Sequence, residues 1–185
     1  MVTPILKNFK GLISITGPSR SGKSKLAEFL IKEQESVTYI ATSKPRPSDP
    51  DWQKRIDIHR KRRPDNWTLI EYPEDICNEI ESIKGEESIL IDSLGGLVEH
   101  HLIKNDFQWD IFQNKLLNCL TANELCIIVV SEEVGWGIVP ATPIGHLFRE
   151  RHTSLASLIG YHSIKSWLAV NGSAIDLNKI GDRIP

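Results

Sequence analysis

One eight-residue segment limits the folds available to this chain more than any other feature. The segment Gly17-Pro18-Ser19-Arg20-Ser21-Gly22-Lys23-Ser24 matches the phosphate-loop pattern G-x-x-x-x-G-K-[ST] at every position. The apolar run 11–16 before it predicts a buried strand, and the apolar spacing in 25–32 after it predicts a helix. Backbone N–H groups at such a helix N-terminus bind phosphate, so the segment predicts a nucleoside triphosphate site.

Three side chains have expected roles beside that loop. Lys23 is expected to reach the outer phosphates, and the Ser24 hydroxyl is expected to hold Mg²⁺. The apolar run Ser88–Asp92 ends in a carboxylate, which in phosphate-loop proteins helps to position the metal or its water. Apolar runs ending in Asp are common, so the interpretation of Asp92 depends on the phosphate loop being present.

Predicted strands and helices alternate along the chain, which indicates an α/β fold of the P-loop type with a mostly parallel sheet flanked by helices. We expect one domain over residues 1–185, with the strands at 11–16, 88–92 and 125–130 near the centre of the sheet. The other expected strands are 37–42, 66–72 and 164–170, and the expected helices are 25–32, 51–63, 73–84, 98–120 with a break at 105–106, and 143–160.

Composition excludes several classes of function. The chain has 22 Lys plus Arg against 24 Asp plus Glu, so it has no global attraction to nucleic acid or to an anionic membrane. Its three cysteines lack C-x-x-C spacing and are odd in number, which argues against a disulfide framework or a zinc site. No stretch approaches the ~20 apolar residues of a membrane span. We expect a cytoplasmic protein.

The predicted helix 51–63 carries a stripe formed by Trp52, Ile56, His59 and Arg63. Two interpretations are open. The helix could be a surface element with a solvated basic face and a packing histidine. Alternatively, it places a nucleophilic or acid–base imidazole among cations that neutralise phosphates. The neighbouring cations are Arg60, Lys61 and Arg62.

Four segments together resemble a known enzyme family. They are the phosphate loop 17–24, the stretch 39–43, the block Arg55–Trp67 followed by Glu71, and the loop Glu133–Pro140. Their order and spacing resemble the bifunctional adenosylcobinamide kinase / adenosylcobinamide-phosphate guanylyltransferase family (CobU) of cobalamin biosynthesis. The resemblance extends to about Arg149.

The resemblance implies two reactions. In the first, ATP or GTP phosphorylates the aminopropanol hydroxyl of adenosylcobinamide. In the second, His59 attacks the α-phosphorus of GTP, and the resulting GMP-histidine passes GMP to adenosylcobinamide phosphate, giving adenosyl-GDP-cobinamide. The family fold is RecA-like and the family assembly is a homotrimer.

The resemblance also implies which residues act. His59 and Lys23 are the expected catalytic residues, and Ser24 and Asp92 the expected ligands of Mg²⁺. The expected nucleotide-contacting residues are Gly17, Pro18, Ser19, Arg20, Ser21, Gly22, Lys23, Ser24, Ala41, Thr42, Ser43, Arg60, Lys61, Arg62, Arg63, Glu71 and Asp92.

Alternatives stay open because the chain departs from the family after Arg149. Thr153, Ala156-Ser157 and Lys165-Ser166 replace a glycine, an Asn-Gln pair and an acid. One of the two activities could therefore be lost. A different P-loop small-molecule kinase would keep Lys23 essential and tolerate replacement of His59. A non-catalytic nucleotide-binding module would bind GTP without turnover.

Overall fold

The seven strands found in the described part of the chain join one sheet. The computed structural model describes residues 9–85, 87–122 and 124–184. The strand order is β3-β2-β4-β5-β1-β6-β7, and every neighbouring pair is parallel except the antiparallel pair β6–β7. The strands are β1 (Gly11–Gly17), β2 (Val37–Ala41), β3 (Thr68–Glu71), β4 (Ser88–Asp92), β5 (Cys126–Glu132), β6 (Lys165–Val170) and β7 (Ser173–Asp176).

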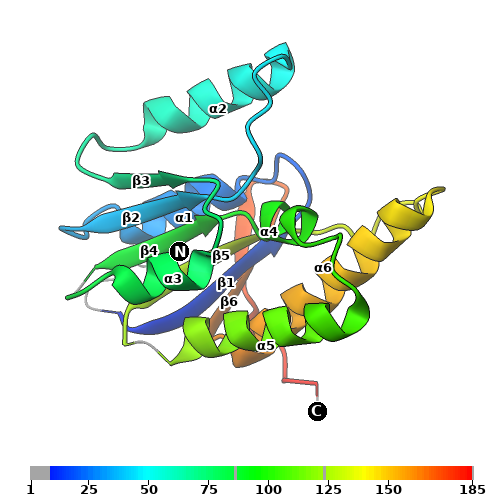
Figure 1. The fold of residues 1–185 in the computed structure, drawn as a ribbon. Helices are drawn as coiled ribbons and strands as arrows, with labels where there is room; N and C mark the ends of the chain where they lie inside the picture. Colours follow the sequence, from blue (N-terminus) through cyan, green and yellow to red (C-terminus); the bar gives the residue numbers. More distant parts are fainter. Residues whose placement is uncertain (1–8, 86, 123, 185) are drawn as a thin grey trace.

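Helices cover both faces of the sheet. Figure 1 shows α3, α5 and α6 over one face and α1 over the other, while α2 lies apart from both layers beyond the β3 edge. The helices are α1 (Lys23–Ile31), α2 (Pro50–Arg62), α3 (Ile76–Ser82), α4 (Leu94–His100), α5 (Asp106–Thr121), α6 (Pro143–His162) and α7 (Leu177–Ile180). This layered arrangement confirms the predicted α/β fold.

The central strands are mostly apolar because both of their faces are buried. In β4, Ile89 and Ile91 join the cluster under α3–α6, whereas Leu90 joins the cluster under α1. Strands β4, β5 and β1 are adjacent and lie at the centre of the sheet, which confirms their predicted central position. Their carboxyl ends therefore lie side by side and bring three loops to one edge of the sheet.

Two parts of the chain differ from the prediction. Helix α4 begins at Leu94, directly after β4, and not at Val98. The segment after β6 forms the hairpin strand β7 and the short helix α7, neither of which was predicted. Cys77, Cys119 and Cys126 are buried. Within the described ranges, no helix is long and apolar enough to cross a bilayer.

Candidate active site

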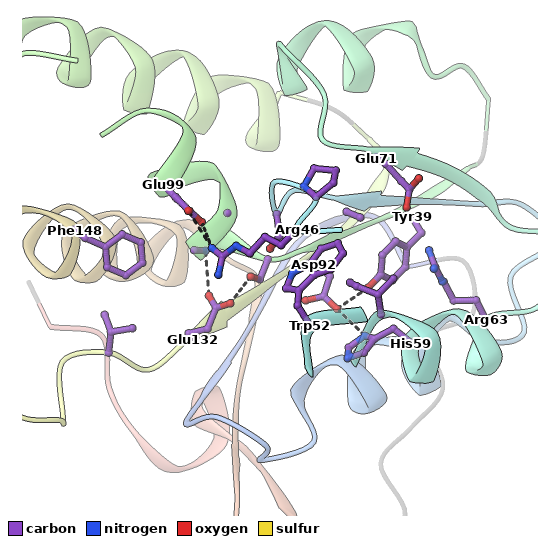
Figure 2. A pocket seen from close by; sticks show the side chains of 18 residues that line it. Tyr39, Arg46, Trp52, His59, Arg63, Glu71, Asp92, Glu99, Glu132 and Phe148 are labelled. Carbon is purple, nitrogen blue, oxygen red and sulfur yellow. Dashed lines mark hydrogen bonds and ion pairs between the residues drawn. The ribbon is translucent and has the colours of Figure 1, made fainter. Parts of the chain in front are cut away.

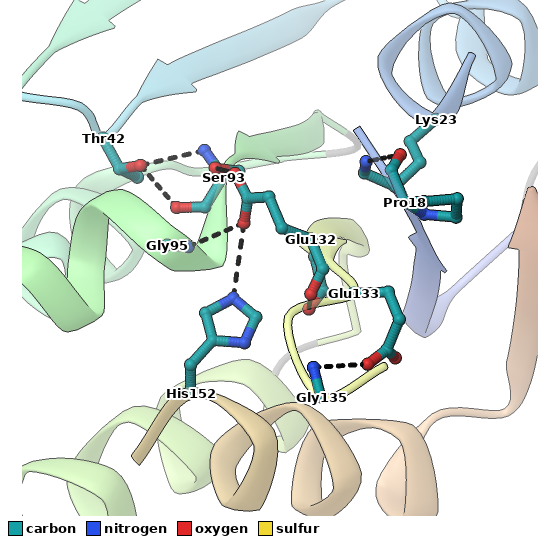
Figure 3. A network of polar contacts seen from close by, with 10 residues as sticks. Pro18, Lys23, Thr42, Ser93, Gly95, Glu132, Glu133, Gly135 and His152 are labelled. Carbon is teal, nitrogen blue, oxygen red and sulfur yellow. Dashed lines mark hydrogen bonds and ion pairs between the residues drawn. The ribbon is translucent and has the colours of Figure 1, made fainter. Parts of the chain in front are cut away.

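The phosphate loop connects β1 to α1 and closes on itself. Gly22 caps α1 with φ of 97°, a left-handed conformation that favours glycine. The amide of Leu26 donates to the Gly22 carbonyl at 2.8 Å, and Lys23 Nζ donates to the Pro18 carbonyl at 2.8 Å (Figure 3). The ammonium group is therefore held within the loop that would surround a phosphate.

A cavity of about 350 Å³ opens at the carboxyl ends of strands β2, β3, β4 and β5. Its volume is in the range of pockets that hold small ligands, and its place is where open parallel sheets bind them. Figure 2 shows that it lies between α2 on one side and α4 and α6 on the other. The lining residues are Tyr39, Ala41, Ser43, Pro45, Arg46, Trp52, Ile56, His59, Arg63, Glu71, Asp92, Ser93, Gly95, Gly96, Glu99, Glu132, Val134 and Phe148.

His59 faces the carboxylate at the end of β4. Its Nδ1 lies 3.6 Å from Asp92 Oδ2, and the same oxygen accepts a hydrogen bond from the Tyr39 hydroxyl at 2.6 Å (Figure 2). Burial and the adjacent carboxylate of Asp92 raise the pKa of Tyr39 above its ordinary value, so Tyr39 remains a donor. Nδ1 has two neighbours with opposite preferences. The Asp92 carboxylate favours a proton on Nδ1 and a lone pair on Nε2, whereas Arg62 Nη2, 3.4 Å from Nδ1, can only donate to that nitrogen.

Two arginines attach α2 to the rest of the protein. Arg62 donates to both carboxylate oxygens of Glu28 on α1, each at 2.9 Å. The guanidinium of Arg63 lies 4.4 Å from the ring centre of Tyr39. At its other end the helix is capped by Asp49, which accepts from the amide of Trp52 at 3.0 Å. These contacts keep the stripe that carries His59 turned toward the cavity.

A second carboxylate, Glu132, ends β5 beside the phosphate loop. Glu132 pairs with Gly17 in the parallel register of β5 and β1. It accepts hydrogen bonds from the Ser93 hydroxyl, from the Gly95 amide at 3.0 Å and from His152 Nε2 at 3.3 Å (Figure 3). Burial alone would raise the pKa of Glu132, but the bonds from His152 and Ser93 outweigh it and lower the pKa to about 2.

This pKa gives Glu132 a pH-dependent contribution to stability. A carboxyl whose folded pKa is depressed stabilises the fold above its unfolded pKa of ~4.3, and this contribution is lost as pH falls toward the folded value. We expect Glu132→Gln to lower the free energy of unfolding by about 2 kcal/mol at pH 7 and by much less near pH 2. Urea unfolding at both pH values measures the difference.

The control for that experiment is Glu124→Gln, because Glu124 is an exposed carboxylate at the opposite edge of the sheet. It should change the free energy of unfolding by less than about 1 kcal/mol at either pH. If Glu132→Gln lowers the free energy of unfolding equally at pH 7 and near pH 2, the assignment of an ionised, hydrogen-bonded Glu132 is contradicted.

The structure brings together only part of the predicted site. Thr42 does not line the cavity, because it is buried and its hydroxyl bonds to the backbone of Ser93. Arg60 and Lys61 are exposed on α2 away from the lining, and Arg62 is occupied by Glu28. Residues 17–24 lie beside the cavity and not in its lining. The predicted residues that do line it are Ala41, Ser43, His59, Arg63, Glu71 and Asp92.

Sequence reasoning gave no role to several residues of this site. Glu132 received no role, although it ends the most apolar strand, β5, as Asp92 ends β4. That shared position at a strand end was the signal that could have found it. Arg46, Glu99 and His152 likewise had no assigned role.

The fold and the phosphate loop define the chain as a P-loop nucleotide-binding protein. An ATPase from the type III secretion system of pathogenic bacteria superposes with a TM-score of 0.53 at 11% identity, covering 91% of this chain and 52% of that chain. A protein of Pyrococcus horikoshii OT3 superposes with a TM-score of 0.52 at 9% identity, covering 95% and 91%. At such low identity these likenesses show the fold alone.

Sequence comparison identifies the family. The profile described as cobinamide kinase / cobinamide phosphate guanyltransferase matches residues 13–177. The bifunctional adenosylcobalamin biosynthesis protein CobU of Escherichia coli (strain K12) is 29% identical, over 90% of this chain and 99% of the relative. The corresponding CobP of Pseudomonas aeruginosa is 38% identical, over 73% and 77%. The chain therefore belongs to the cobinamide kinase / cobinamide phosphate guanyltransferase family and is a transferase enzyme.

Proposed function

We propose that the protein carries out both reactions that its family name describes. A nucleoside triphosphate phosphorylates the hydroxyl of adenosylcobinamide, and GMP from GTP is then transferred to adenosylcobinamide phosphate. The observation that carries the proposal is the position of His59, which lines the cavity beside Asp92 at the edge of the sheet where the phosphate loop lies. A histidine that only packed α2 against the protein would not need to face a ligand cavity.

The proposed guanylyl transfer uses the imidazole as a covalent carrier. The lone pair on His59 Nε2 attacks the α-phosphorus of GTP, the bond to the bridging oxygen breaks, and pyrophosphate leaves. Asp92 supports this step because its carboxylate lies 3.6 Å from Nδ1 and stabilises the proton there as positive charge develops on the ring. Arg63 lines the same cavity and supplies positive charge next to the phosphates.

The phosphate loop supports the proposed binding of GTP and ATP. Backbone amides of residues 17–24 and the Lys23 ammonium suit a polyphosphate. Mg²⁺ fits the oxygen donors Ser24 and Asp92, since this ion takes one or two protein ligands together with phosphates and water. When bound, Mg²⁺ would neutralise phosphate charge.

The experiment that tests the proposal follows the nucleotide label. With α-³²P-labelled GTP, the protein should acquire acid-labile, base-stable label, and adenosylcobinamide phosphate should remove it as adenosyl-GDP-cobinamide. With γ-labelled nucleotide, the label should appear in adenosylcobinamide phosphate and not on the protein. Chromatography separates the products. Homotrimeric assembly belongs to the same proposal, and light scattering measures it.

Two outcomes would favour the other candidate functions. Tight GTP binding without label or turnover would indicate a nucleotide-binding module. Phosphorylation of a small molecule without protein-bound label would indicate a P-loop kinase that lacks guanylyl transfer. Each of these outcomes contradicts the proposed pair of reactions.

A further inference from the structure

An ion pair crosses the cavity between two residues that have no role in the chemistry described above. Arg46 Nη2 lies 3.0 Å from Glu99 Oε1 and 3.1 Å from Glu99 Oε2, joining the β2–α2 loop to α4. Both residues line the cavity, and Figure 2 shows the Arg46 side chain between Glu99 and Asp92. A ligand beside His59 would therefore meet this arginine.

The Arg46 guanidinium can leave Glu99 at little cost, although the Arg46 backbone is held in place. The side chains of Arg46 and Glu99 are 49% and 46% exposed, and ion pairs at such exposure contribute little to stability. The Arg46 carbonyl accepts hydrogen bonds from the Asp49 amide at 3.1 Å and from Gln53 Nε2 at 3.3 Å. The guanidinium can therefore change partner while its stem stays at the cavity.

The second half of guanylyl transfer needs a cation at this place. Its acceptor is a phosphate, which must approach the phosphate already bonded to His59, so two anions meet in one cavity. Among the described lining residues, the cations are Arg46 and Arg63, and Arg63 already lies over the ring of Tyr39. The acidic lining residues Glu71, Asp92, Glu99 and Glu132 would repel the incoming phosphate further.

We propose that Arg46 leaves Glu99 and binds the phosphate of the acceptor, adenosylcobinamide phosphate. This inference rests on the proposed function. An oxygen of the bound phosphate forms a bond to the α-phosphorus while the phosphorus–Nε2 bond breaks, and the electron pair of that bond returns to the imidazole ring of His59. The guanidinium donates two parallel hydrogen bonds to the phosphate, which orients it for this attack.

Glu99 then acts as a competitor that confers selectivity. A phosphate dianion offers Arg46 more charge than one carboxylate, so the phosphorylated acceptor displaces Glu99. Unphosphorylated adenosylcobinamide carries no anion at that position and leaves the pair intact. Arg46 and Glu99 together would thus restrict guanylyl transfer to the product of the kinase reaction.

The experiment isolates the second half-reaction. The covalent GMP-enzyme is formed with α-³²P-labelled GTP, freed of nucleotide and pyrophosphate, and mixed with increasing adenosylcobinamide phosphate. Loss of protein-bound label gives the half-saturating acceptor concentration, and a separate titration gives that of GTP for labelling. The variants are Arg46→Ala, Arg46→Lys and Glu99→Gln, with Lys44→Ala as the control, because Lys44 is an exposed cation of the same loop outside the cavity lining.

Replacing Arg46 and replacing Glu99 should shift the half-saturating acceptor concentration in opposite directions. Arg46→Ala should raise the half-saturating acceptor concentration by about 10- to 100-fold, and this rise should be at least about tenfold larger than any change for GTP. Arg46→Lys should fall between Arg46→Ala and the unmodified protein, since an ammonium group cannot bind in the bidentate manner. Glu99→Gln should lower the acceptor concentration by about 2- to 5-fold, and Lys44→Ala should leave it within about twofold.

Other results would overturn the inference. If Arg46→Ala and Glu99→Gln shift the half-saturating acceptor concentration in the same direction, the ion pair is only a structural link between the β2–α2 loop and α4. If Arg46→Ala fails to label, or raises the GTP requirement as much as that of the acceptor, Arg46 serves the nucleotide. An unmodified protein that never acquires label would instead contradict the proposed function, so the two failures are distinguishable.

Discussion

In a His59→Asn variant, we expect protein-bound label from α-³²P-labelled GTP to disappear. Formation of adenosyl-GDP-cobinamide should fall by at least about 10³-fold, because an amide cannot form the phosphoramidate that carries GMP. Phosphorylation of adenosylcobinamide should fall much less, by under about tenfold, since that step uses the γ-phosphate and requires no bond to the imidazole. Protein-bound radioactivity and chromatography of the two products measure the difference.

The matched control for this experiment is His162→Asn. His162 is exposed at the end of α6, just before β6 begins, and so lies at the opposite edge of the sheet from the cavity. Its replacement should leave both reactions within about twofold of the unmodified protein. Label that persists in His59→Asn would show that His59 is not the carrier and would support the alternative of a packing histidine on α2.

The fold was largely predictable because its central strands have local signals. In β4 and β5 this signal is a continuous apolar run ended by polar residues, as in Ser88–Asp92, and in β1 it is a shorter alternating apolar run. The hairpin β6–β7 was missed although its signal was present. Asn171 and Gly172 both have positive φ, 48° and 73°, as a tight Asn-Gly turn requires.

The start of α4 illustrates a limit of propensity. Gly95 and Gly96 disfavour a helix, so the prediction began that helix only after them. In the folded protein, tertiary packing outweighs this low helix propensity. Only glycine fits at position 96, because a Cβ there would lie 2.4 Å from Thr42 Oγ1. The glycines allow α4 to approach the end of β2, which a sequence without its fold does not reveal.

The site was predictable where its chemistry is local in sequence. The phosphate loop is one continuous segment, and a stripe of helical spacing on α2 placed Trp52, Ile56, His59 and Arg63 together, all of which line the cavity. The pairs Glu132–His152 and Arg46–Glu99 join residues 20 and 53 positions apart. No local sequence pattern specifies such pairs, because their members become neighbours only when the sheet and its helices have assembled.

Replacing Lys23 by Met should lower phosphorylation of adenosylcobinamide by about 10²- to 10³-fold. Met retains the apolar stem, which suits a residue that is only 8% exposed, but it removes the charge that would stabilise the transferring phosphate. Initial rates with γ-³²P-labelled nucleotide measure the loss, and circular dichroism checks that the variant retains the helix content of the unmodified protein. The control is Lys25→Met, two residues further along α1, which removes an exposed charge and should leave the rate within about twofold. Equal rates in the Lys23 and Lys25 variants would mean that residues 17–24 do not hold the donor nucleotide, and the phosphate would then have to bind elsewhere along the carboxyl edge of the sheet.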